Sequence, residues 1–549
     1  MASFSLTGNY VDIPGRRVFP AEVIVEDGHI VAIREQDDPM EGYLLPGFVD
    51  AHVHVESSML IPSEFARLAV THGTVATVSD PHEIANVLGV PGVEFMIANG
   101  AQVPFHFFFG APACVPATAF ETAGARIDAA GVGALLERPE VRYLSEMMDF
   151  PGVLRGDAEV MTKIAHAHRL GKPVDGHAPG LRGEEARAYA AAGISTDHEC
   201  FTREEALDKL AAGMHILIRE GSAAKNFEAI IDLLRDHPER ILFCSDDKHP
   251  DGLVLGHIDD LCRRAVAKGI DVFHVLRAAC LNPIAHYSLP VGQLRLGEPA
   301  DLIVVDDLTQ FRVRRTYIRG QLVAEDGRSR IASVPSERPN QFNCSPKTPE
   351  DFEVPGAEDG TVLAIRALDG QLITGKEQVR VRVHDGRCVP DVTRDLLKIA
   401  VVNRYADAPP AVGWIRGFGL QRGALAGSVA HDSHNIVAVG TSDADLCAAI
   451  NAVIGARGGV AVSDGPFTNT LPLPIAGIMT DADAYSVAEA YATIDRQAKA
   501  LGSGLAAPFM TLSFMALLVI PHLKMSDIGL FDGDAFRLLV PSKEPARRT

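Results

Sequence analysis

Short apolar runs alternate with longer segments of helical periodicity over residues 46–289. The apolar runs are typical of buried parallel strands, and the segments between them are long enough for helices. This alternation predicts an α/β fold of the (β/α)8 TIM-like barrel type, in which a helix follows each strand. The predicted strands cover residues 48–55, 73–80, 105–110, 141–146, 173–177, 193–198, 214–219 and 241–246. The predicted helices include residues 184–192, 203–212 and 227–236.

The regions on either side of this barrel have a different pattern. Residues 1–45 contain short alternating runs, and Asp27-Gly28 between two of these runs is a hairpin signal. A similar pattern returns at residues 301–323, so we expect a small β-sandwich domain built from residues 1–45 and 290–335, with the barrel over 46–289. Four prolines within residues 336–359 mark a linker. Apolar runs and a helical segment beyond it predict a separate C-terminal α/β domain over residues 360–549.

The composition limits the classes of partner. The net charge of −20 argues against nucleic acid and anionic membranes, which favour clustered Lys and Arg, and is compatible with a small neutral or cationic ligand. Eight cysteines without a C-x-x-C pair indicate neither a disulfide framework nor a thiolate zinc site. Residues 1–10 lack the features of a secretory signal, and the apolar stretch 505–521 is interrupted by polar residues and proline. We therefore expect a soluble, cytoplasmic protein.

Polar residues stand at the carboxyl ends of the predicted strands, where barrel enzymes carry their chemistry. Two histidines that are two positions apart on the first strand project to one face, and single histidines or carboxylates end four other strands. Each alone could be a buried histidine with a backbone partner or a helix-capping aspartate. Together they are enough for two divalent metals with one bridging carboxylate, although the choice among Zn, Mn and Fe stays open. The candidate metal ligands are His52, His54, Glu146, His177, His198 and Asp246.

The opening Pro-Gly-Phe-x-Asp-x-His-x-His at residues 46–54 resembles the amidohydrolase superfamily. Longer strings resemble the bacterial adenine deaminase family, and they lie at residues 52–60, 80–87, 115–122, 244–250 and 428–435. The resemblance implies an amidohydrolase-type barrel and hydrolysis of adenine to hypoxanthine and ammonia, a step of purine salvage, at a binuclear centre of Mn or Fe, with Zn possible. It also implies that His52, His54 and Asp246 bind one ion and that His177 and His198 bind the other. Many relatives bridge the metals with a carboxylated lysine, but residues 141–150 contain no lysine, and Glu146 takes that place.

The chemistry of adenine deamination can be stated from the substrate. C6 of adenine is a weak electrophile with a poor leaving group, so the reaction needs a metal-activated hydroxide and two proton transfers. Asp246 is a candidate first proton acceptor, and His82 could bind the purine or a carboxylate. The carboxylates that could carry a proton to the ring are Glu83, Glu56 and Glu199, although each could equally cap a helix or remain solvated. The segment 431–435 could bind a ligand, but polar residues before a strand are more typical of a turn, so a turn is the preferred interpretation.

Two other hypotheses remain open from the sequence. Related barrels share this type of ligand set, so the substrate could instead be a cyclic amide or another aminopurine. A catalytically inactive scaffold is the third hypothesis, but such a protein would be expected to have lost ligands. Adenine and water are the expected small-molecule partners, without nucleic acid or membrane. A symmetric homodimer or higher homo-oligomer is the default assembly.

Overall fold

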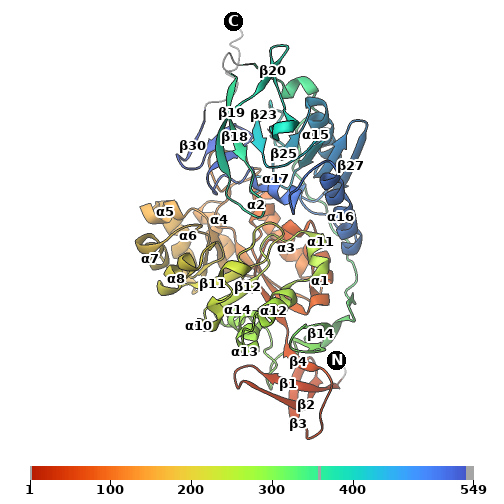
Figure 1. The fold of residues 1–549 in the computed structure, drawn as a ribbon. Coiled ribbons are helices and arrows are strands. Elements are labelled where there is room, and N and C mark those ends of the chain that lie inside the picture. The colour runs from red at the N-terminus through yellow and green to blue at the C-terminus, as the bar shows by residue number, and fades with distance from the viewer. Residues whose placement is uncertain (1–2, 357–359, 540–549) are drawn as a thin grey trace.

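The computed structural model describes residues 3–356 and 360–539. Eight parallel strands form a closed barrel. The barrel region lies between the N-terminal strands and the C-terminal part of the chain (Figure 1). Parallel bridges Val174↔Ile194 and Val53↔Asp246 connect its five-stranded and three-stranded parts into one closed ring. The strands are β5 (Phe48–Val53), β6 (Thr74–Ser79), β7 (His106–Ala111), β8 (Val141–Met147), β9 (Val174–Gly176), β10 (Thr196–Asp197), β11 (His215–Arg219) and β12 (Ile241–Cys244). All eight predicted strands are confirmed, and so is the predicted fold class.

Helices lie between the barrel strands. Several begin at a side chain that accepts a hydrogen bond from the first turn, such as Asp157 before α6 and Thr202 before α8. The barrel helices are α1 (Pro62–Ala69), α2 (His82–Leu88), α3 (Val90–Gly100), α4 (Ala129–Leu136), α5 (Phe150–Arg155), α6 (Ala158–Arg169), α7 (Gly183–Ala191), α8 (Arg203–Ala211), α9 (Phe227–Ile230), α10 (Leu233–Asp236), α11 (Pro250–Leu255), α12 (Ile258–Ala267), α13 (Val272–Leu276) and α14 (Asn282–Tyr287).

The helix predicted at residues 227–236 is instead two short helices, α9 and α10. The backbone N–H of Leu234 donates to the carbonyl of Ile231, and that of Arg235 donates to the carbonyl of Asp232. These bonds span three residues rather than four, so the chain winds more tightly between the two helices.

Strands from both flanks of the barrel form one eight-stranded sheet in the order β16-β15-β14-β13-β4-β1-β2-β3. β4 lies between β1, to which it is parallel, and β13, to which it is antiparallel, so the two flanks are joined inside the sheet. Figure 1 shows this sheet at one end of the barrel. Its strands are β1 (Phe4–Asp12), β2 (Arg17–Glu26), β3 (His29–Glu35), β4 (Tyr43–Pro46), β13 (Leu302–Val305), β14 (Val313–Ile318), β15 (Gln321–Glu325) and β16 (Arg328–Ser329).

The C-terminal region forms a second eight-stranded sheet in the order β19-β18-β23-β22-β25-β24-β26-β27, and helices α15 (Asp443–Ala456), α16 (Ala484–Ala500) and α17 (Pro508–Phe514) accompany it. This confirms a C-terminal α/β domain, here called the C-terminal domain. Its central strands are β18 (Thr361–Arg366), β19 (Gly375–Arg380), β22 (Leu397–Val402), β23 (Ala411–Arg416), β24 (Ala424–Gly427), β25 (Ile436–Gly440), β26 (Gly459–Asp464) and β27 (Phe467–Pro472). Shorter strands lie beside it: β17 (Val354–Pro355), β20 (Arg382–His384), β21 (Arg387–Val389), β28 (Leu523–Met525), β29 (Leu530–Asp532) and β30 (Arg537–Leu538).

The C-terminal domain lies against the barrel, at the end opposite the flank sheet (Figure 1). The backbone N–H of Thr480 donates to the carbonyl of Met59 at 2.9 Å, and the amide of Asn435 donates to the carbonyl of Thr122 at 2.8 Å. Buried apolar side chains of both parts belong to one continuous cluster. The carboxyl ends of the barrel strands therefore face the C-terminal domain. Within the described ranges, no helix is long and apolar enough to cross a bilayer.

Candidate metal centre

The six predicted metal ligands lie together at the carboxyl end of the barrel. Each side chain is buried, with at most 6% of its residue exposed. Barrel closure brings them from the ends of five strands: His52 in β5 and His54 just after it, Glu146 in β8, His177 after β9, His198 after β10 and Asp246 after β12.

His52, His54 and Asp246 form the first group of donors. The Nε2 atoms of the two histidines are 3.2 Å apart, and they lie 3.3 and 3.4 Å from Oδ1 of Asp246. Donor atoms about 2.0–2.1 Å from a tetrahedral ion lie roughly 3.4 Å from one another. The spacing of this group therefore fits a single divalent ion.

Glu146 connects this group to the second one. Its Oε2 lies 2.8 Å from Nδ1 of His177 and 3.1 Å from Nε2 of His198. Its other oxygen, Oε1, lies 3.5 Å from Nε2 of His54. One carboxylate thus faces the donors of both groups, which is the arrangement expected of a bridging ligand. Nitrogen and oxygen donors without sulfur suit a divalent metal centre.

The electrostatics of the centre favour ionised carboxylates. Burial alone would raise the pKa of Asp246, but Arg219 and the histidines outweigh it and hold that pKa well below its usual range. For Glu146, His177 and His198 likewise outweigh burial and lower the pKa. Both side chains are therefore present as anions, which is the form that binds metal.

Arg219, at the end of β11, lines the same cavity but is not among the site residues that the sequence predicts. Its guanidinium donates to Oδ2 of Asp246 at 2.9 Å and forms a two-pronged ion pair with Glu199. The arginine is buried, and the ion pair lowers the pKa of Glu199 to about 2 despite its burial. Arg219 thus orients one oxygen of Asp246 while the other faces His52 and His54. Like the candidate metal ligands, Arg219 stands at the carboxyl end of a predicted strand, the one over residues 214–219.

His82 and Glu83 are the first two residues of helix α2 and lie next to the candidate metal ligands. Nδ1 of His82 lies 3.0 Å from Oδ2 of Asp80 and 3.5 Å from Oε1 of Glu146, while its Nε2 lies 3.3 Å from Oε1 of Glu83. Burial opposes protonation of His82, but Asp80 and Glu83 outweigh it and raise its pKa well above the ordinary value. This end of α2 therefore brings a histidine and a carboxylate next to the ligand cluster.

The C-terminal domain contributes to the same site. His431 hydrogen-bonds one oxygen of Glu83 through Nδ1, and His434 hydrogen-bonds the other through Nε2. Burial would raise the pKa of Glu83, but the histidines hold it well below its usual value. Residues 431–433 do form a turn, as predicted, but the turn also carries side chains into the site. No local pattern indicates this contact, because the partners are 348 residues apart in the chain.

Glu56, the remaining predicted carboxylate, has a different position. It lies in the short 3₁₀ helix Val55–Ser58, where its Oε1 accepts a hydrogen bond from the backbone N–H of Ile84 at 3.3 Å. Burial raises its pKa to about 7. Of the three carboxylates predicted to carry protons, Glu83 and Glu199 line the cavity at the barrel mouth. Glu56 is not part of that lining and instead binds the backbone of α2.

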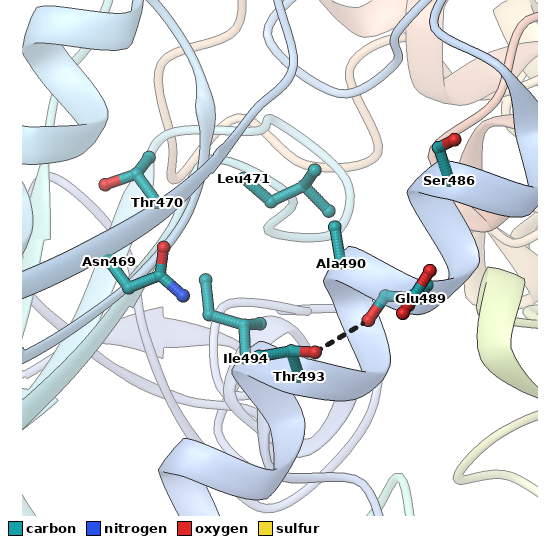
Figure 2. Close-up of a pocket in the computed structure, with 8 residues that line it drawn as sticks. All are labelled: Asn469, Thr470, Leu471, Ser486, Glu489, Ala490, Thr493 and Ile494. Atoms are coloured by element: carbon teal, nitrogen blue, oxygen red, sulfur yellow. Dashed lines mark hydrogen bonds between the residues drawn. The ribbon is translucent and has the colours of Figure 1, made fainter.

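A larger hollow lies elsewhere, between β27 and α16 of the C-terminal domain (Figure 2). Its volume is about 360 Å³, and it opens to solvent. Its lining residues are Asn469, Thr470, Leu471, Ser486, Glu489, Ala490, Thr493 and Ile494. Its lining contains a single carboxylate, Glu489, and no histidine, so this hollow lacks the set of side chains that could hold a metal ion.

The barrel and its histidine and carboxylate donors define a metal-dependent hydrolase of the amidohydrolase type. The profile of the amidohydrolase family matches residues 43–323, more than half of the chain. The chain therefore belongs to the amidohydrolase family.

Comparison along the whole chain narrows the family further. The profile of the adenine deaminase C-terminal domain matches residues 371–537. The adenine deaminase of Salinibacter ruber is 58% identical over 541 residues, which cover 98% of this chain and 99% of the relative. Those of Sulfurovum sp. and Borreliella burgdorferi are 55% and 45% identical, covering 97% and 98% of this chain and 99% of each relative. Within the amidohydrolase family, the chain belongs with the adenine deaminases.

Proposed function

We propose that this protein hydrolyses adenine to hypoxanthine and ammonia, a reaction of hydrolases that act on the C–N bonds of cyclic amidines, and that it serves purine salvage. The observation that carries the proposal is the convergence of four histidines and two carboxylates at the barrel mouth, in a chain that aligns over nearly its full length with adenine deaminases. A barrel alone would not define the reaction, because this fold supports many chemistries.

We propose that two divalent ions, Mn or Fe with Zn as an alternative, are bound by the six side chains. His52, His54 and Asp246 would hold one ion and His177 and His198 the other, with Glu146 between them, as the two groups of short distances support. Bound ions of this kind lower the pKa of a coordinated water, so that hydroxide is available near neutral pH.

The protein's own groups would move the protons. We propose Asp246 as the first proton acceptor, since Arg219 binds one of its oxygens and the other faces the donor cluster. His82 and Glu83, which line the cavity and contact each other, are proposed to pass the two protons of the attacking water on, one to the ring nitrogen and one to the leaving amine. Glu199 is a weaker candidate since both of its oxygens pair with Arg219, and Glu56 is weaker since it does not line the cavity.

Further proposals concern the whole chain. We propose a division into residues 1–45 with 290–335, 46–289, a linker over 336–359, and 360–549, which the two eight-stranded sheets and the barrel support. A homodimer or higher homo-oligomer is proposed from the general frequency of symmetric assemblies. A cytoplasmic location is proposed because all eight cysteines are free thiols.

A substrate panel tests the proposed reaction. Purified protein supplied with Mn²⁺ is incubated with adenine, guanine, adenosine, cytosine or dihydroorotate, and the ultraviolet spectrum and released ammonia are followed. We expect conversion of adenine with one ammonia per hypoxanthine formed. Hydrolysis of a cyclic amide, with adenine untouched, would instead support the alternative in which the barrel acts on another substrate.

A further inference from the structure

The cavity above the metal centre has walls from two parts of the chain. The barrel supplies the metal-binding residues together with His82 and Glu83, and the C-terminal domain supplies Asp432 among other residues. The space that remains between the two walls is about 20 Å³, close to the volume that one water needs. The C-terminal domain therefore closes directly over the site and would contact any substrate that enters it.

Two buried polar atoms on the wall from the C-terminal domain lack a hydrogen-bond partner among the described residues. Asp432 is 3% exposed and His431 is 2% exposed. Within residues 3–356 and 360–539, Oδ2 of Asp432 and Nε2 of His431 have no hydrogen-bond partner. A buried carboxylate oxygen without a donor is costly, so its presence in a cavity lining indicates that a ligand provides the donor.

The position of Asp432 relative to the metal centre suggests which donor that is. Its Oδ1 lies 3.7 Å from Nε2 of His82, whose Nδ1 lies 3.5 Å from Oε1 of Glu146. One imidazole ring thus separates Asp432 from the proposed bridging ligand. A purine whose C6 lies at the metal centre extends its five-membered ring away from that centre, and this ring carries the only ring N–H of adenine.

Apolar side chains of the same wall complement the flat face of a purine. Leu372, Phe514 and Leu517 line the cavity, and the ring centroid of Phe514 is 5.2 Å from that of His431. Aromatic rings stack on such surfaces and gain from burial of their faces. A carboxylate beside an aromatic surface is suited to a neutral heterocycle with one N–H donor.

We propose that the C-terminal domain completes the substrate site, and that Asp432 accepts a hydrogen bond from the ring N–H of adenine and so selects the free base over N9-substituted purines. This inference rests on the proposed function and goes beyond it, because it assigns a specificity-determining residue outside the barrel. An N9-substituted purine would leave the carboxylate oxygen unpaired, which a polar site of this kind rejects strongly.

The test compares wild type, Asp432→Ala and Asp432→Asn with adenine and 9-methyladenine as substrates. Asp432→Ala removes the acceptor, and we expect the KM for adenine to rise about 10- to 100-fold, with a smaller change in kcat. Asp432→Asn keeps an acceptor oxygen and should recover part of the loss. The preference of the wild type for adenine over 9-methyladenine should exceed about 100-fold and should collapse in Asp432→Ala. A purely structural role would not change this preference.

The control is Asp534→Ala, which removes an exposed carboxylate of the same domain that pairs with His522. It should leave the KM and the preference unchanged, and metal content and thermal midpoints are measured for every variant. A KM within twofold of wild type in Asp432→Ala would overturn the inference while leaving the deaminase function intact. Equal use of 9-methyladenine by the wild type would overturn it even if the variants fail to fold. Absence of adenine turnover in the metal-loaded wild type would overturn the proposed function, and this inference with it.

Discussion

Lys524 allows the effect of burial on a pKa to be tested at a residue that is not a candidate metal ligand. The lysine lies in β28 and is fully buried. Its ammonium group donates to the carbonyls of Leu372 at 2.7 Å and Phe514 at 2.9 Å, two residues that line the candidate site. Burial lowers its pKa from 10.5 to about 7, because the charged form loses its hydration.

This shift has a defined sign and size. Between pH 7 and 10.5 the unfolded chain keeps the proton that the folded protein releases, so the free energy of unfolding rises with pH in that window. Below pH 7 both states are protonated, and the contribution is constant. The full shift corresponds to about 5 kcal/mol, of which about 3 kcal/mol falls between pH 7 and 9.5.

The assay is urea unfolding of the wild type and Lys524→Met at pH 6, 7, 8, 9 and 9.5. At each pH, the unfolding free energy of the variant is subtracted from that of the wild type, which removes the contributions of all other titrating groups. The lost hydrogen bonds to the two carbonyls add an offset that does not depend on pH. We expect the stability of the wild type relative to the variant to increase by about 3 kcal/mol from pH 7 to 9.5 and to stay level below pH 7. A difference that is constant over the whole range would refute the assigned pKa.

Two further predictions concern the metal centre. Asp246→Asn or His177→Asn should abolish adenine turnover and reduce bound metal while the circular dichroism spectrum is unchanged, and near-normal turnover in either would contradict the ligand assignment. Arg219→Met leaves the Glu199 and Asp246 carboxylates buried without their cation, so in metal-free protein it should lower the free energy of unfolding by about 3–5 kcal/mol. The exposed Arg182→Met is its control and should have little effect, and a similarly small effect of Arg219→Met would refute the role of the ion pair.

The sequence predicts the barrel well because parallel strands buried on both faces leave continuous apolar runs. Strand ends also predict that the six candidate ligands lie together, since barrel closure brings equivalent positions together whatever their separation in the chain. Arg219 also occupies such a position, since it is the last residue of the strand predicted over 214–219. This residue could have been found from the sequence.

The contribution of the C-terminal domain could not be predicted in the same way. His431 and His434 meet Glu83 through the packing of one domain on another, and neither periodicity nor spacing encodes that contact. The turn that carries them has the local residues of an ordinary turn. Its role becomes visible only when the buried partners of Glu83 are identified in the folded chain.

The most direct test of the central claim is a metal titration of adenine deamination. Chelator-treated protein is reconstituted with increasing equivalents of Mn²⁺, and hypoxanthine and ammonia are measured together with bound metal. We expect the metal-free protein to be inactive and activity to rise to a plateau at two ions per chain, one for each of the two proposed donor groups that Glu146 joins. Full turnover of adenine by metal-free protein would contradict this expectation.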